Sequence, residues 1–135
     1  MSEYKKPVVV PSEDSIPFWD AAKKHRLSLQ KCGTCGSFRF PPAPLCPECT
    51  SMGGVWTDLK GHGKVFSFVV FHRAYHPSFE GDLPYAVALV ELEEGPRLIS
   101  NIVGIPPDQI RCDMPVAVVF EDVTPGCTLP KFKPV

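Results

Sequence analysis

The chain has 135 residues, of which 44% are hydrophobic and 21% are charged. This length allows one ordinary domain or two very small ones, and the composition excludes a disordered chain. The net charge of -1 supplies no global attraction for nucleic acid, so no nucleic-acid partner is expected. Sixteen prolines exclude a helical bundle, because proline breaks the interior of a helix.

No segment has the character of a membrane span or of a secretory signal. The longest apolar runs, such as residues 85–90, fall far short of the ~20 residues that a membrane-spanning helix needs. Residues 1–7 lack the apolar core of a signal peptide. The sequence therefore predicts a cytoplasmic protein without membrane contact.

The N-terminal region, residues 1–26, is predicted to be an arm followed by a helix. Polar and then apolar residues, with two prolines, predict an extended arm over 1–11. Apolar residues at helical spacing, led by Phe18, predict an amphipathic helix over 14–25. The apolar face of this helix must pack on the rest of the chain or on a partner. An alternating segment then predicts a strand over 27–31.

Four cysteines form two C-x2-C pairs that are separated by ten residues: Cys32, Cys35, Cys46 and Cys49. Each pair forms a tight turn, and two facing turns supply four thiolates in the tetrahedron that zinc prefers. The same sulfur geometry also accepts iron. A redox dithiol would use one pair beside a βαβ unit, which is missing here. We expect a structural metal, because four thiolates leave no open coordination position for catalysis, and it contributes roughly 10–16 kcal/mol to folding.

The segment between the two pairs, 37–45, is too short and too rich in proline for a helix. It predicts a short strand and an extended return, so residues 27–52 are interpreted as a zinc ribbon. Cys112 and Cys127 lie far downstream and are expected to be plain, at least partly buried thiols.

Strand patterns dominate after the second pair, and residues 53–135 are interpreted as one domain. Gly61 and Gly63 are read as punctuation between the first two strands, and Pro106 opens a short turn or helical segment before the last one. Five strands with a break before the last predict a five-stranded OB-fold barrel. The expected fold is therefore mainly β, with an N-terminal helix, a rubredoxin-like zinc ribbon and this barrel. The predicted strands cover residues 55–60, 64–73, 84–93, 97–103 and 115–121.

Basic residues gather in the ribbon region, where residues 21–47 include five basic side chains and no acidic one. One interpretation is a solvated surface, and the other is a patch facing the phosphates of a nucleotide-like ligand beside Phe38, Phe40 and Trp56.

The histidines give no strong catalytic signal. His72 and His76 flank a strand end, where they could bind an anion or belong to a loop held by hydrogen bonds, and we favour the second reading. Known nucleophile, metalloprotease and phosphate-loop motifs are missing. An enzyme that uses His72, His76 or Cys127 stays a minor hypothesis, and catalysis by this chain alone is not expected.

Several segments in chain order resemble family 35 of the domains of unknown function (DUF35). They combine an aromatic pair in the helix, the two cysteine turns and the barrel strands. These segments are Phe18–Trp19, Cys32–Gly36, Cys46–Cys49, Gly61–Phe68, His72–Arg73, Pro84–Leu92, Gly104, Met114–Glu121 and Leu129–Pro134.

The resemblance implies a rubredoxin-like ribbon joined to an OB-fold, and metal binding by the four cysteines. It also implies a non-catalytic accessory subunit in a hetero-oligomer with a thiolase-like enzyme: a thiolase, an acyltransferase or a steroid side-chain aldolase. The partner would carry the catalytic residues, and this chain would help to form its acyl-CoA site. From charge and position, Lys31, Arg39 and Arg73 are the candidate CoA contacts.

A module that binds single-stranded nucleic acid is the alternative function, because OB-folds and zinc ribbons commonly have this role. The acidic residues between 80 and 94 and the slightly negative net charge argue against it.

Overall fold

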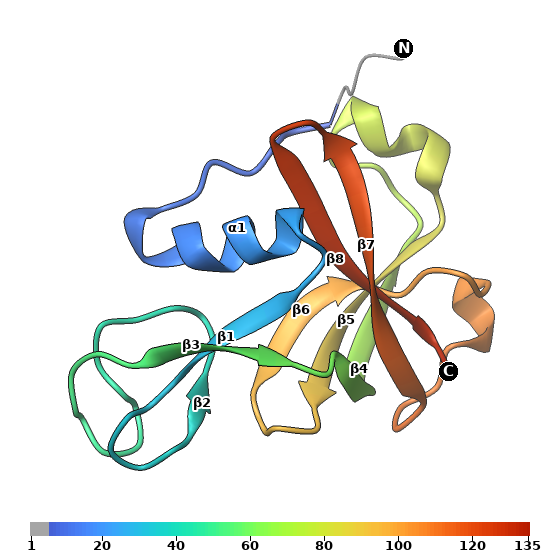
Figure 1. Ribbon diagram of the computed structural model, residues 1–135. Helices are drawn as coiled ribbons and strands as arrows, with labels where there is room; N and C mark the ends of the chain where they lie inside the picture. Colours follow the sequence, from blue (N-terminus) through green and yellow to red (C-terminus); the bar gives the residue numbers. More distant parts are fainter. Residues whose placement is uncertain (1–5) are drawn as a thin grey trace.

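The computed structural model describes residues 6–135, so the first five residues of the predicted arm lie outside the described residues. One short helix, a three-stranded sheet and a five-stranded sheet make up the fold (Figure 1). The helix is α1 (Ile16–Lys23), and the 3-10 helices are η1 (Glu13–Ser15), η2 (Pro77–Asp82) and η3 (Pro107–Gln109). The strands are β1 (Leu27–Lys31), β2 (Phe38–Arg39), β3 (Val55–Leu59), β4 (His62–Phe71), β5 (Tyr85–Leu92), β6 (Arg97–Asn101), β7 (Pro115–Thr124) and β8 (Cys127–Pro134).

Helix α1 is shorter than the predicted span of 14–25. Its first turn is a separate 3-10 turn, and His25 ends the helical path because its φ of 57° lies in the left-handed region. Phe18, Ala21 and Ala22 are buried on one face, as the pattern predicts. No helix within residues 6–135 is long and apolar enough to cross a bilayer.

The helix packs on its own chain, which answers the question that the sequence left open. Phe18 is 3% exposed and meets the ring of Phe40 at 5.3 Å between centroids. It belongs to one buried cluster with Leu29 of β1 and with Val65 and Phe132 of the barrel. This continuous core joins the helix, the first ribbon strand and the barrel.

The smaller sheet has the strand order β2-β1-β3, and all of its pairs are antiparallel. The predicted strand over 27–31 and the short strand after the first cysteine pair are confirmed. The predicted place of strand 55–60 in the barrel is wrong, because β3 pairs along its whole length with β1. Sequence patterns identify a strand but not its partner, which explains this error. The domain boundary predicted between residues 52 and 53 stays a prediction.

The larger sheet has the order β6-β5-β4-β7-β8 and closes on itself. Its two outer strands meet through a parallel bridge between Ile102 and Phe132, and the Val103 amide donates to the Phe132 carbonyl at 2.8 Å. This order and its one parallel contact give the five-stranded barrel that the sequence predicts. Its fifth strand is β8, which the sequence reading missed.

Gly63 lies inside β4 rather than between two strands, so its predicted role as a break is wrong. A Cβ atom at this position would lie 2.4 Å from the carbonyl oxygen of Glu91 on β5. Glycine therefore lets β4 and β5 approach closely here. Gly61 does mark the turn before β4, with a φ of 78°.

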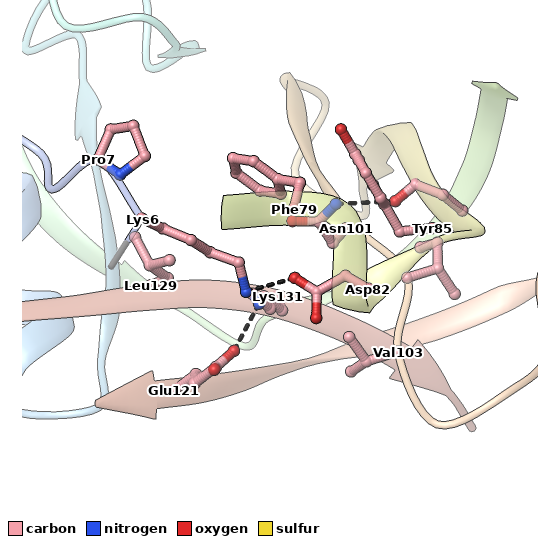
Figure 2. A pocket seen from close by; sticks show the side chains of 12 residues that line it. Lys6, Pro7, Phe79, Asp82, Tyr85, Asn101, Val103, Glu121, Leu129 and Lys131 are labelled. Atoms are coloured by element: carbon pink, nitrogen blue, oxygen red, sulfur yellow. Dashed lines mark hydrogen bonds and ion pairs between the residues drawn. The ribbon is translucent and has the colours of Figure 1, made fainter. Parts of the chain in front are cut away.

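The described end of the N-terminal arm lies along the barrel. Lys6 forms an ion pair with Asp82 of η2, and Lys131 of β8 pairs with Glu121 of β7 nearby (Figure 2). The pair between Lys6 and Asp82 places the arm beside the connection between β4 and β5.

A second polar contact joins the end of the helical region to β7. The His25 Nε2 atom lies 3.0 and 3.1 Å from the two carboxylate oxygens of Asp122, and the Thr128 hydroxyl donates to Asp122 at 2.6 Å. The hydrogen bond from Thr128, followed by that from His25, lowers the pKa of Asp122.

We predict that Gly63→Ala lowers the free energy of unfolding by about 1–3 kcal/mol, since the added methyl group forces two paired strands apart. Urea denaturation measures this change. Gly126→Ala is the control, because no atom lies within 4 Å of its Cβ position, and it should change stability by less than about 1 kcal/mol. Equal effects of the two variants would contradict the close approach.

We predict that Asp122→Asn makes the free energy of unfolding depend less on pH in the acid range. Because the folded pKa is lowered, the unfolded chain binds the proton more tightly, so stability falls as pH drops through the window below about 4. Urea denaturation between about pH 6 and pH 2 should show the largest loss for the variant at the upper end and little difference at the lower end. Thr128→Val should reduce this pH dependence in part. A difference in stability between wild type and Asp122→Asn that is the same at every pH would rule out the ionised carboxylate as the cause.

Candidate metal centre

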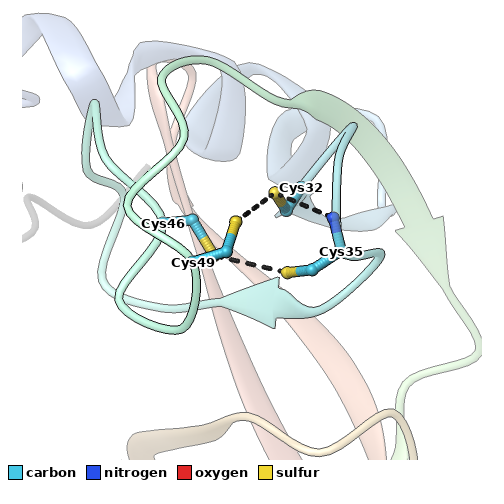
Figure 3. A group of neighbouring side chains, drawn as sticks. All are labelled: Cys32, Cys35, Cys46 and Cys49. Atoms are coloured by element: carbon cyan, nitrogen blue, oxygen red, sulfur yellow. Dashed lines mark hydrogen bonds between the residues drawn. The ribbon is translucent and has the colours of Figure 1, made fainter.

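The four predicted cysteines converge at the end of the three-stranded sheet (Figure 3). Their sulfur atoms all lie within 4.8 Å of one another, with 3.6 Å from Cys32 to Cys49 and 3.6 Å from Cys35 to Cys46. A tetrahedral zinc with bonds of about 2.3 Å separates its sulfurs by about 3.8 Å. The four thiols therefore fit one tetrahedral ion.

Two turns with the same hydrogen-bond pattern position these sulfurs. In the first turn, the Gly36 amide donates to the Cys32 carbonyl at 3.0 Å, and the Cys32 amide donates to Ser37 at 2.8 Å. The second turn repeats this pattern from Cys46, with Thr50 in the place of Gly36. The predicted left-handed residue after the first pair is confirmed, with φ of 77° at Gly36, and Thr50 adopts 61° without being glycine.

Backbone amides point at the first sulfur. The amides of Thr34 and Cys35 lie 3.4 and 3.5 Å from Cys32 Sγ. These hydrogen bonds, that from Cys35 first, lower the pKa of Cys32 because they stabilise its thiolate. A turn that donates amides to sulfur thus favours the form that binds metal.

Ser37 contacts the sulfurs of both turns. Its Oγ atom lies 2.9 Å from Cys35 Sγ and 3.6 Å from Cys46 Sγ. The Cys49 amide and then the Ser37 hydroxyl lower the pKa of Cys46 to about 6. Ser37 also lowers the pKa of Cys35, but burial and the sulfurs of Cys46 and Cys32 outweigh this effect, and the pKa of Cys35 is raised.

Two serines beside the sulfurs were not among the predicted site residues. Ser51 lies 3.3 Å from Cys49 Sγ, as Ser37 lies beside Cys35. Each serine follows the second cysteine of its pair by two residues, and this shared spacing was the available signal. The hydroxyls serve as hydrogen-bond partners that orient the ligands.

The two remaining cysteines differ in exposure. Cys127 is buried in β8, as expected. The expectation of partial burial is wrong for Cys112, which is exposed in the turn before β7. Both were expected to be plain thiols that are at least partly buried, and only Cys127 is buried, with 7% exposure.

Arg39 is buried at the centre of the ribbon, with 4% exposure. Its guanidinium group donates to the Ala43 carbonyl at 3.0 Å, to Gln30 Oε1 at 3.2 Å and to the Gly53 carbonyl at 2.8 Å. These bonds join β2 to both ends of the segment that carries the second cysteine pair. Its predicted contact with CoA stays a prediction, and this burial weighs against it.

The other two candidate CoA contacts lie on different parts of the molecule. Lys31 ends β1 in the ribbon and places its ammonium group 5.6 Å from the Phe38 ring centroid. Arg73 follows β4 on the barrel, and its guanidinium carbon lies 5.5 Å from the Tyr75 ring centroid. Both are exposed, and β1 and the end of β4 lie on opposite sides of the molecule (Figure 1).

The hydrogen-bonded loop that the sequence favoured is confirmed at His76 alone. His76 precedes η2, and its Nδ1 atom accepts a hydrogen bond from the Ser78 amide at 3.2 Å. Both histidines are exposed.

Two family models match the chain in the order of its structure. A rubredoxin-like zinc ribbon domain of ChsH2 matches residues 19–51, and the C-terminal OB-fold domain of ChsH2 matches residues 56–121.

The chain is also similar to proteins of two kinds. It is 45% identical over 123 residues to a probable enoyl-CoA hydratase alpha subunit from Thermomonospora curvata, covering 91% of this chain and 38% of that protein. It is 39% identical over 103 residues to a DUF35 domain-containing scaffold protein from Methanothermobacter thermautotrophicus, covering 75% and 76%. The chain thus spans well under half of the hydratase subunit but about three quarters of the scaffold protein.

One solved structure superimposes along nearly the whole chain. It is described as an Ltp2-ChsH2(DUF35) aldolase, and the matched chain is 43% identical with a TM-score of 0.84. The match covers 96% of this chain and 98% of the other.

We predict that Cys46→Ser lowers metal content and melting temperature together, because it removes one of four ligands. Native mass spectrometry and thermal denaturation measure the two quantities. Wild-type protein should carry one zinc ion per chain. Cys112→Ser is the control and should change neither quantity, since Cys112 is exposed and lies outside the cluster. Metal-free wild-type protein, or a variant with unchanged melting temperature, would contradict the structural role.

Proposed function

The chain belongs to the DUF35 family of proteins with a rubredoxin-like zinc ribbon and an OB-fold, and we propose that it is a non-catalytic subunit of a thiolase-like enzyme. In this proposal the partner is a thiolase, an acyltransferase or a steroid side-chain aldolase, and this chain helps to form its acyl-CoA site. The metal of the ribbon is zinc, which holds the subunit in shape.

The observation that carries the proposal is the nearly complete match to the ChsH2(DUF35) chain of a solved aldolase. Both chains are covered almost end to end, so the similarity concerns a whole subunit rather than a shared motif. The names of two further relatives, a hydratase alpha subunit and a scaffold protein, also describe parts of assemblies.

The chemistry of the described residues supports a non-catalytic role. Four thiolates complete the coordination of a zinc ion and leave no position for substrate. The His25–Asp122 pair has the appearance of a catalytic dyad, but the nearby Thr128 hydroxyl bonds to the carboxylate rather than to the imidazole. A nucleophile must lie beside the base, and this geometry does not provide one.

Apolar side chains on the outer face of the barrel support a protein partner. Val69 on β4 and Ile99 on β6 are 56% and 71% exposed, and Phe66 at the β4 bulge is 43% exposed. Leu89 of β5 lies between them, paired with Ile99. Exposed apolar surface on adjacent strands is typical of protein–protein contacts.

The proposal is tested by co-expression with a thiolase-like enzyme from the same genome. A tagged version of this chain should retain the enzyme on affinity purification, and the complex should bind CoA by calorimetry. Lys31→Ala or Arg73→Ala should weaken CoA binding if these residues contact the ligand. Failure to retain any thiolase-like partner would overturn the proposed function. Salt-dependent binding of single-stranded DNA by the isolated chain would favour the nucleic-acid alternative.

We predict that Ile99→Asp reduces the amount of enzyme retained at least tenfold, because a buried unpaired carboxylate costs more than about 1.4 kcal/mol at an interface. Val10→Asp is the control, since Val10 is 87% exposed on the arm and belongs to none of the barrel strands. Quantitative gel electrophoresis of the purified fractions measures both. If both variants retain as much enzyme as wild type, the outer face of the barrel is not the contact.

A further inference from the structure

Strand β6 has a backbone edge that the barrel leaves mostly unpaired. It pairs with β5 over Arg97–Asn101 and lies at one end of the strand order of its sheet. On its other side, the bridge to β8 begins only at Ile102. We propose that this free edge binds an extended segment of the partner enzyme by β-strand addition. This inference rests on the proposed function, because the segment belongs to the thiolase-like partner.

Two hydrogen bonds fix the direction in which the backbone groups of β6 point. The Leu92 amide donates to the Pro96 carbonyl at 2.9 Å, so the even-numbered residues of β6 face β5. The Val103 amide donates to β8 at 2.8 Å, away from β5. Because these directions alternate along a strand, the amide and carbonyl groups of Arg97 and Ile99 also point away from β5. Within the described part of the chain, these four groups have no hydrogen-bond partner.

Strand β8 does not pair with these groups. Opposite Ser100, β8 has Pro130, which has no amide to donate. The contact there is a hydrogen bond of 2.8 Å from the Ser100 hydroxyl to the Pro130 carbonyl, so a side chain replaces a backbone bond. A cavity of about 210 Å³ lies beside this contact, between Leu98–Asn101, Leu129–Lys131 and three aromatic side chains: Phe18, Trp19 and Phe40.

A second cavity, of about 580 Å³, follows the same strand toward its start. It lies between the ribbon and the β5–β6 turn, whose residues 94–96 line one side. Phe40 lines both cavities, so open space follows the edge from this turn to Asn101. The edge selects an extended chain, because the amides and carbonyls of such a chain repeat with the spacing of β6. A helix has already paired its own backbone groups and gains nothing from them.

The side chains of the smaller cavity favour an apolar residue in the bound segment. Trp19 and Phe40 are only partly buried against the core, and Ile99 is 71% exposed. The one charged side chain of its lining, Lys131, already pairs with Glu121. Alternate side chains of a strand share one face, so a segment with apolar residues at alternate positions matches this lining.

Amide hydrogen exchange in the co-purified complex tests the proposal. The Arg97 and Ile99 amides should exchange at least about tenfold more slowly in the complex than in the isolated chain, because they gain acceptors. The Leu98 and Ser100 amides face β5 and should change little. A retained enzyme with unchanged exchange at Ile99 would overturn this inference alone, whereas failure to retain any enzyme would overturn the proposed function as well. Slowing that depends on the concentration of the isolated chain would assign the edge to a second copy and would also overturn the proposal.

Two variants of Ile99 separate the role of the backbone from that of the side chain. Ile99→Pro and Ile99→Ala both remove the isoleucine side chain, but only proline removes the outward amide, and strand edges tolerate proline where the amide is unpaired. Ile99→Pro should retain at least about tenfold less enzyme than Ile99→Ala, because a carbonyl of the bound segment loses its donor. Thermal denaturation checks that both variants fold. Equal retention by the two folded variants would refute backbone pairing, and if the proline variant does not fold, the exchange measurement decides.

Discussion

The convergence of four cysteine sulfurs is the constraint on which the ribbon depends. Three short strands bury few side chains of their own, and the chain between β2 and β3 has no regular structure apart from the bridge between Leu45 and Met52. A metal ion held by both turns would fix this segment against β1. The buried guanidinium of Arg39 then fills the interior that an apolar core would occupy in a larger domain. Because Arg39 presents its donors in a rigid fork, lysine could not make the same set of bonds.

Strand β1 couples the ribbon to the barrel. Leu29 is fully buried and belongs to the same cluster as Phe18 of the helix and Phe132 of β8. Movement of the ribbon against the barrel would open this core, so the metal site and the OB-fold act as one body. A subunit of this kind can present its outer faces in a fixed relative orientation, which is the property that the proposed accessory role requires.

Local patterns in the sequence predicted the features that depend on few residues. The cysteine spacing predicted the cluster of four sulfurs, and alternating apolar residues predicted β4 to β7. Long-range features were less accessible. The prolines at 130 and 134 weakened the strand pattern of β8 in the sequence. Their missing amides cost little in the fold, because β8 makes only a limited contact with β6. The pairing of β3 with β1 also escaped prediction, because both partners have ordinary strand patterns. The burial of Arg39 emerges only when the segments that carry Gln30, Ala43 and Gly53 meet around its guanidinium group.

Closure of the barrel has a consequence for synthesis on the ribosome. The ribbon has all of its ligands and strands once residue 59 has emerged, whereas the bridge that closes the barrel needs Phe132. Because domains begin to fold as they emerge, the metal-bound ribbon can form while the barrel is still an open sheet. During that interval β6 has an unpaired edge, and the nascent chain is then most exposed to strand pairing with its neighbours.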